Sequence, residues 1–200
     1  MSVSLSEGGN SNLQQLDVTR KSGQSEADAK YIECIATAAR PEPVFKWMIG
    51  DEEMSAEIDV TSDNLDETSG KADYKSTFTY YADKNHNQKE LVCRVEHRGY
   101  TQAQEAEKQN EAKLRLNVNY APMAWTKPQT FYKMVIGQEA KIDVHIEANP
   151  KPDSAKWLLG NGTELPAGSS SDDGKFTSGV LVPGVSILIK KCRSGLVFNL

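Results

Sequence analysis

The stretch YIECIATAARPEPVFKW (residues 31–47) alternates apolar and polar side chains on both sides of a proline-rich turn. A period of two is typical of a β-strand with one buried face. The RPEP segment at 40–43 predicts the turn, and Cys34 and Trp47 fall on inward positions of the strands before and after it. The inward set is Ile32, Cys34 and Ala36, then Phe45, Trp47 and Ile49.

A second cysteine, Cys93, together with this stretch indicates the fold. Cys34 lies 13 residues before Trp47 and 59 residues before Cys93, each on a separate alternating strand. This order and spacing are the signature of the immunoglobulin fold, in which a disulfide joins two packed sheets and the tryptophan packs against it. We expect a Cys34–Cys93 disulfide, worth about 4 kcal/mol in the chain-entropy model. Leu91 stands where many such domains carry a tyrosine.

Further short β-rich runs indicate an antiparallel sandwich over 24–120. They are STFTYY (76–81), LVCRVEH (91–97) and KLRLNV (113–118). We interpret the acidic, Ser/Gly-rich segment 59–73 as a connection. Residues 1–23 are polar and predict a flexible lead, with at most a first edge strand at its end. Residues 119–122 (NYAP) close this unit, with Pro122 ending strand pairing.

The stretch TQAQEAEKQNEAK (101–113) is the one helix-like segment. Its apolar residues are all alanines, so it offers no face for a core. We interpret it as a long, polar hairpin loop between the last two strands, and we expect the loop 99–112 to be mobile. The alternative is a recognition loop at the end of the sandwich.

The motif then recurs at VHIEANPKPDSAKW (144–157), with Val144 in place of the cysteine and Trp157 in place of the tryptophan. KIDVHIE predicts one strand with Ile142, Val144 and Ile146 inward, and Asn-Gly at 161–162 predicts a hairpin turn. VSILI at 185–189 predicts a further strand. Residues 121–200 supply 80 residues, whereas such a domain needs about 100. We therefore expect a truncated second sandwich whose inward residues are partly exposed. These residues are Ile142, Val144, Ile146 and Trp157.

Composition excludes several classes of function. The formal charge of −5, without a dense basic run, argues against nucleic acid. No apolar stretch is long enough to span a bilayer, and the N-terminus lacks the apolar core of a signal peptide. A Cys34–Cys93 bond nevertheless requires an oxidising compartment. We therefore expect a fragment of a longer exported protein, with Cys192 free and any membrane attachment in a segment outside this chain.

Nothing in the chain predicts an enzyme. Asp143, His145 and Glu147 alternate on one strand face in a spacing that could bind a metal, although a solvated face is the simpler interpretation. Cys34 and Cys93 point inward, where a nucleophile would be unreachable. We assign no catalytic residue, metal, cofactor or small-molecule substrate. Asn161 begins the one glycosylation sequon, Asn-Gly-Thr, which the hairpin turn also explains.

KELVCRVEHRG (89–99), KLRLNVNYAP (113–122) and AKIDVHIEANPKPDSAKW (140–157) together resemble the second and third immunoglobulin domains of the insect fasciclin III family. The resemblance covers roughly residues 24–176 and is most specific in 89–157. It implies a cell-surface adhesion molecule whose third domain also lacks its inter-sheet cysteines. Val144 is then a native replacement that fills most of the volume of the sulfur.

Two classes of function remain open. The resemblance implies an extracellular cell–cell adhesion protein whose protein partner is a like molecule. The alternative is a secreted, soluble immunoglobulin-domain protein acting as a decoy or recognition factor. An intracellular muscle-type immunoglobulin protein is a third alternative, and it would leave Cys34 and Cys93 reduced.

Overall fold

The structure is a computed structural model, and β-strands make up most of it. It describes residues 2–11, 13–21, 29–54, 58–106, 108–124, 139–159, 162–172, 176–179 and 185–189. The chain divides into two compact units, Met1–Asn119 and Tyr120–Leu200. Asn161, the candidate glycosylation site, and Cys192, for which the sequence predicts a free thiol, lie outside the described residues. No helix in the described part is long and apolar enough to cross a membrane.

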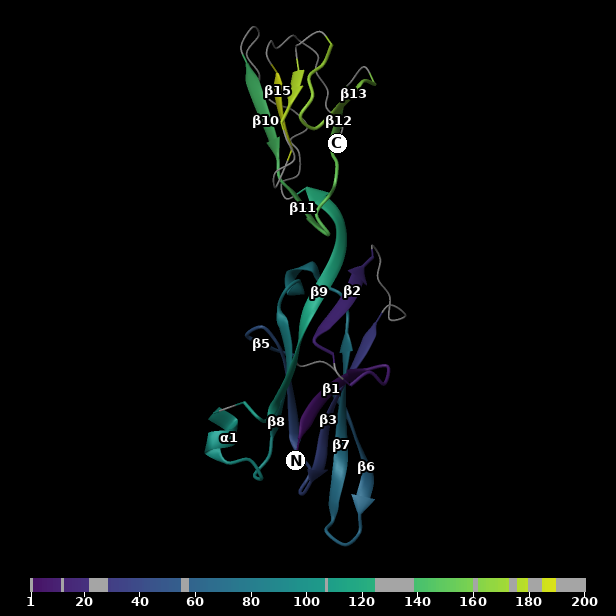
Figure 1. Cartoon of the computed structure of the whole chain (residues 1–200), viewed down its shortest axis with the longest axis vertical. Helices are drawn as coiled ribbons and strands as arrows, with labels where there is room; N and C mark the ends of the chain where they lie inside the picture. Colours follow the sequence, from purple (N-terminus) through teal and green to yellow (C-terminus); the bar gives the residue numbers. More distant parts are fainter. Residues whose placement is uncertain are drawn as a thin grey trace. The chain divides into compact units, whose positions relative to one another are not determined.

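Unit 1 is an immunoglobulin sandwich of two antiparallel sheets (Figure 1). One sheet has the order β1-β3-β7-β6, and the other runs β9-β8-β4-β5, with β2 paired to β9. The first order, together with the central β9-β8-β4 strands of the second, is that of immunoglobulin constant-type domains. The strands are β1 (Val3–Glu7), β2 (Gln15–Arg20), β3 (Lys30–Ala39), β4 (Val44–Ile49), β5 (Glu52–Met54), β6 (Ile58–Asp66), β7 (Lys71–Tyr80), β8 (Glu90–Glu96) and β9 (Glu111–Ala124).

The core of unit 1 is organised around the Cys34–Cys93 disulfide. It joins β3 of one sheet to β8 of the other, with the two Cα atoms 6.4 Å apart, and both cysteines are fully buried. Trp47, also fully buried, stacks on Phe78 at a centroid distance of 5.1 Å. Its indole Nε1 donates a hydrogen bond of 2.9 Å to the Ser76 hydroxyl. The only polar atom of the tryptophan is therefore satisfied inside the core.

A buried tyrosine occupies the corner between β7 and β8. Tyr80 ends β7, and its ring lies 5.9 Å from that of His86 in the short 3-10 helix Lys84–His86. Burial raises the pKa of the Tyr80 hydroxyl to about 12, although the neighbouring backbone of Asp83 opposes this shift. Leu91 is fully buried on the next strand.

The prediction of a flexible lead over 1–23 is wrong, because this segment contributes two strands. β1 pairs with β3, with Leu5 opposite Cys34, and β2 pairs with β9. Leu5, Leu16 and Val18 are buried. Leu16 and Val18 stand at alternate positions of β2, and Leu5 is the buried apolar residue of β1, so each short strand covers the core although most of the segment is polar.

The interpretation of 59–73 as a connection is also wrong. β6 and β7 form a hairpin across a turn at 67–70, in which Gly70 adopts a φ of +66°. β6 lies at the edge of its sheet, and residues 60–66 are exposed on both faces. A strand without a buried face carries no alternating pattern, so its sequence resembles a loop.

Unit 2 repeats part of this topology. The order β10-β15-β14 corresponds to β3-β7-β6, and the hairpin β12-β13 corresponds to β4-β5. β11 pairs with the last residues of β9, 120–124. The strands are β10 (Ala140–Val144), β11 (Ile146–Asn149), β12 (Lys156–Leu158), β13 (Glu164–Pro166), β14 (Phe176–Ser178) and β15 (Val185–Ile189).

Three expectations for unit 2 need correction. The predicted strand 141–147 breaks at His145, after which β11 joins a different sheet. β9 continues past Pro122, which lies at the irregularity in its pairing with β11, where a missing N–H is tolerated. Ile142, Val144 and Trp157 are at most 3% exposed, so only Ile146, which is half-buried, fits the expected uncovered core.

We predict that Ser76→Ala destabilises unit 1 by about 1–3 kcal/mol, because it leaves the Trp47 N–H buried without an acceptor. Urea unfolding of the full chain, followed by tryptophan fluorescence, measures the change. The control is Thr77→Ala, one residue along and outside the core, which should stay within about 0.5 kcal/mol of the wild type. Equal effects of the two substitutions would contradict the role of this hydrogen bond.

Candidate protein-recognition surface

The side chains of β4, β8 and β9 that point away from the core form a charged face. Cross-strand register sets its pattern, since residues paired across antiparallel strands share a face. Arg94 lies opposite both Lys46 and Glu111, and Glu90 lies opposite Arg115. The charged face consists of Lys46, Glu90, Arg94, Glu96, Glu111, Lys113 and Arg115.

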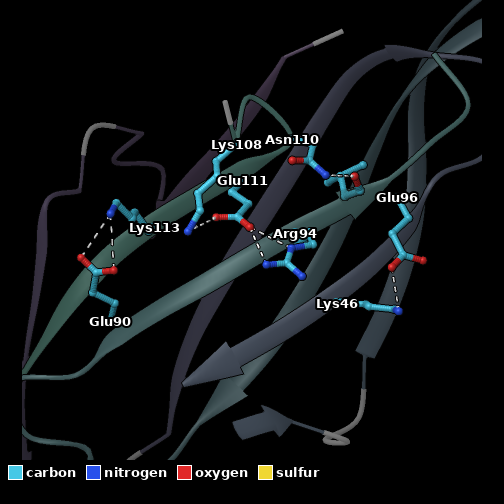
Figure 2. Close-up of polar contacts among 9 residues, drawn as sticks. Lys46, Glu90, Arg94, Glu96, Lys108, Asn110, Glu111 and Lys113 are labelled. Carbon is cyan, nitrogen blue, oxygen red and sulfur yellow. Dashed lines mark hydrogen bonds and ion pairs between the residues drawn. The ribbon is translucent and has the colours of Figure 1, made fainter. Parts of the chain in front are cut away.

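Three ion pairs lie across this face, and in each of them a lysine or arginine contacts a glutamate (Figure 2). The Lys46 ammonium lies 2.7 Å from Glu96, and the Lys113 ammonium lies 3.3 Å from Glu90. The hydrogen bond and charge of Glu96 raise the pKa of Lys46. These pairs are exposed, so they contribute little to stability and remain available for other contacts.

The pair between Arg94 and Glu111 differs because the acid is buried. Arg94 donates from Nη2 at 2.6 Å and from Nε at 2.8 Å to the same Glu111 oxygen. The Glu111 side chain is only 8% exposed, and Lys108 lies 3.9 Å from its other oxygen. Two cations therefore neutralise one desolvated carboxylate, and the pair holds the start of β9 against β8.

A loop from 97 to 110 connects β8 and β9, next to the Arg94–Glu111 pair. Hydrogen bonds between Asn110 and Val95 join its two ends. The Val95 N–H donates to the Asn110 carbonyl at 2.8 Å, and the Asn110 amide returns a bond of 3.2 Å to the Val95 carbonyl. Asn110 is 6% exposed. The loop thus begins and ends at a buried, two-way hydrogen-bonded pair (Figure 2).

The predicted polar loop does connect the strands β8 and β9, but its residues 102–106 form the helix α1 (Gln102–Ala106), and β9 already begins at Glu111. Thr101 caps the helix: its hydroxyl accepts from the Gln104 N–H at 3.3 Å, and the Gln104 side chain accepts from the Thr101 N–H at 3.0 Å. This is a capping box. The Thr-x-x-Gln motif at 101–104 is the sequence signal for this helix. The interpretation as a loop relied instead on the lack of an apolar face.

His97 ties the loop to the proline-rich turn at 40–43. Its Nε2 lies 2.9 Å from the Pro41 carbonyl oxygen, and the Gly99 N–H donates to its Nδ1 at 2.8 Å. A carbonyl only accepts and a backbone N–H only donates, so Nε2 carries the proton and Nδ1 is the acceptor. The predicted turn and the loop therefore form one hydrogen-bonded end of the sandwich.

A polar hollow of about 530 Å³ lies between this loop and the charged face. Its walls carry carboxylates, an amide and two cations, a set that suits polar or charged side chains of a protein partner. Within the described residues, no group of three or more histidine, cysteine, aspartate or glutamate side chains could hold a metal ion. The lining residues are Arg94, Glu96, Glu105, Lys108, Asn110 and Glu111.

The residues singled out by the sequence belong to the scaffold. Cys34, Cys93 and Trp47 form the core beneath the charged face, and Val144 and Trp157 form the core of unit 2, where Val144 pairs with Val185. Asp143, from the possible metal set, forms an ion pair with Lys141 at 3.0 Å. The charged face itself was missed. Its signal is the opposite charges at alternate positions of ELVCRVE and EAKLRLN.

Arg94→Ala should destabilise unit 1 by about 1–3 kcal/mol, since it leaves the buried Glu111 carboxylate with one distant cation. Lys113→Ala, on the same face but in an exposed pair, should cost at most about 1 kcal/mol. Urea unfolding of both variants makes the comparison. If Lys113→Ala proved the more destabilising, Arg94 would not hold the base of the loop.

His97→Ala should loosen the loop without unfolding the sandwich. Each lost hydrogen bond contributes about 0.5–1.5 kcal/mol, so amide hydrogen exchange at Lys108 and Gln109 should speed up about threefold to tenfold. Arg98→Ala alters an exposed neighbour and serves as the control. Unchanged exchange in His97→Ala would show that α1 and Asn110 hold the loop without the histidine.

The match to a family model agrees with the architecture of unit 1. Residues 12–104 match the model of the CD80-like C2-set immunoglobulin domain. The chain is similar to the crystal structure of Rst D1-D2, with 16% sequence identity and a TM-score of 0.43, over 57% of this chain and 48% of that one. It thus spans about half the length of that protein, and no curated protein matches it significantly. Unit 1 has the immunoglobulin fold, and the match of its residues 12–104 to a C2-set domain supports the immunoglobulin superfamily.

Proposed function

We propose that this protein acts outside the cell in cell–cell adhesion, and that the charged face of unit 1 contacts the same face of a like molecule. An immunoglobulin domain generally binds other proteins, and no catalytic family is indicated. The Cys34–Cys93 disulfide favours an oxidising compartment such as the cell exterior.

The charged face carries the proposal. A two-fold contact places one surface patch against its own copy, so the patch must complement itself. Alternating cations and anions meet this requirement, because each pair can be matched by the inverted pair of a second molecule. Lys113 and Glu90 have side chains 59% and 55% exposed, and Glu96 is 50% exposed. These groups can reach a partner without leaving a charge buried and unpaired.

The loop 97–110 supports the same proposal. Bonds from His97, Thr101 and Asn110 hold its backbone, so little conformational entropy remains to be lost when a partner binds. The polar hollow beside it would receive a side chain of the partner. The resemblance of 89–157 to the fasciclin III family is consistent with adhesion between like molecules.

Two-colour bead aggregation with the full chain tests the proposal. The variant E90K/K113E inverts one ion pair and keeps the net charge. Wild-type beads should aggregate, and mixed wild-type and variant contacts should fall about threefold to tenfold, because like charges then face each other. The control K156E/E164K inverts a comparable exposed pair in unit 2, 2.6 Å apart, and its beads should mix freely with wild type.

Each other outcome has a defined meaning. Free mixing of E90K/K113E with wild-type beads would remove the charged face from the contact. Wild-type beads that stay dispersed would overturn the homophilic proposal. If the chain were then found to bind a different protein, the secreted decoy alternative would replace it.

A further inference from the structure

The outer edge of β6 is open in unit 1. β6 ends the order β1-β3-β7-β6, and among the described residues no strand pairs with its far side. Side chains on both of its faces are exposed from 60 to 66, including Val60 at 37% and Leu65 at 66%. An edge strand presents unpaired N–H and C=O groups, which another extended chain can use as a template.

Residues 60–63 of β6 are extended although their side chains are exposed. Its ladder with β7 runs from Ile58 opposite Phe78 to Asp63 opposite Asp73, before an irregularity between Asp63 and Asp66. The Asn64 side-chain amide donates to Asp73 at 3.0 Å and fixes the end of this register. The regular part of the strand is therefore preformed, which lowers the entropic cost of adding a partner strand.

The charge of this edge restricts the partner. Residues 58–67 carry Asp59, Asp63, Asp66 and Glu67 and no lysine or arginine. Hydrogen bonds from the Ser69 hydroxyl and the Thr68 backbone lower the pKa of Asp66, so it is ionised at neutral pH. On the neighbouring strand, Lys71 lies opposite Asp66, and Lys75 is paired with Glu33 at 3.1 Å.

A second copy of β6 is a poor occupant, because antiparallel pairing of two such strands would bring their carboxylates together. Like charges across strands are destabilising, whereas opposite charges stabilise the pair. We propose that β6 is a docking edge for an extended, basic segment of a partner protein, which joins the sheet as a further strand and places lysine or arginine beside the acidic residues. This edge belongs to the sheet opposite the charged face, so the inference does not depend on the homophilic proposal.

The probe is a ten-residue peptide in which lysine alternates with valine, titrated into the full ¹⁵N-labelled chain at up to millimolar concentration. Amide shifts should concentrate in 58–66, and the same peptide with glutamate in place of lysine should cause none. N-methylation of one alternate set of peptide amides should abolish binding, while methylation of the other set should leave it. This asymmetry is specific to strand addition, since only one edge of the peptide faces β6.

The variant D59N/D63N, which changes two residues of the regular part of β6, should weaken binding about threefold to tenfold through loss of cross-strand charge pairs. The matched control E52Q/E53Q removes the same charge from β5, at the edge of the other sheet, and should leave affinity unchanged. Absence of binding, shifts centred elsewhere, equal effects of both variants, or binding that survives both methylation patterns would each overturn the inference.

Discussion

The disulfide between Cys34 and Cys93 is the constraint on which unit 1 depends. It joins β3 to β8, the strand that lies between β4 and β9 in the second sheet. Because side chains alternate along a strand, an inward Cys93 places Arg94 on the opposite side of the sheet. Register with the neighbouring strands then places Lys46 and Glu111 beside it. The covalent bond in the core thus also determines which residues form the charged face.

Much of unit 1 could be predicted from its sequence, because a strand with one buried face has an apolar residue at every second position. Cys34, Trp47 and Cys93 stand on strands of this kind, and their order defines the fold. β6 could not be predicted, since an edge strand exposed on both faces has no alternation. α1 was missed for a related reason. Its stability comes from the Thr101–Gln104 capping box and from closure at Asn110, whereas the prediction relied on an apolar face.

In unit 2, tertiary packing determines features that the local sequence pattern does not predict. Val144 and Trp157 are buried in unit 2, where part of the strand order repeats that of unit 1. The break at His145 could not be read from an uninterrupted alternation. Burial of Trp157 to 1% exposure likewise depends on which segments cover it.

The unequal distribution of cysteines gives the two units different responses to mechanical load. A chain pulled from its ends cannot extend between Cys34 and Cys93 without breaking a covalent bond, which withholds about 200 Å of contour length. Residues 120–200 contain a single cysteine, so unit 2 has no internal cross-link and resists tension through hydrogen bonds and packing alone. Under force, unit 2 can lengthen fully while the core of unit 1 stays clamped.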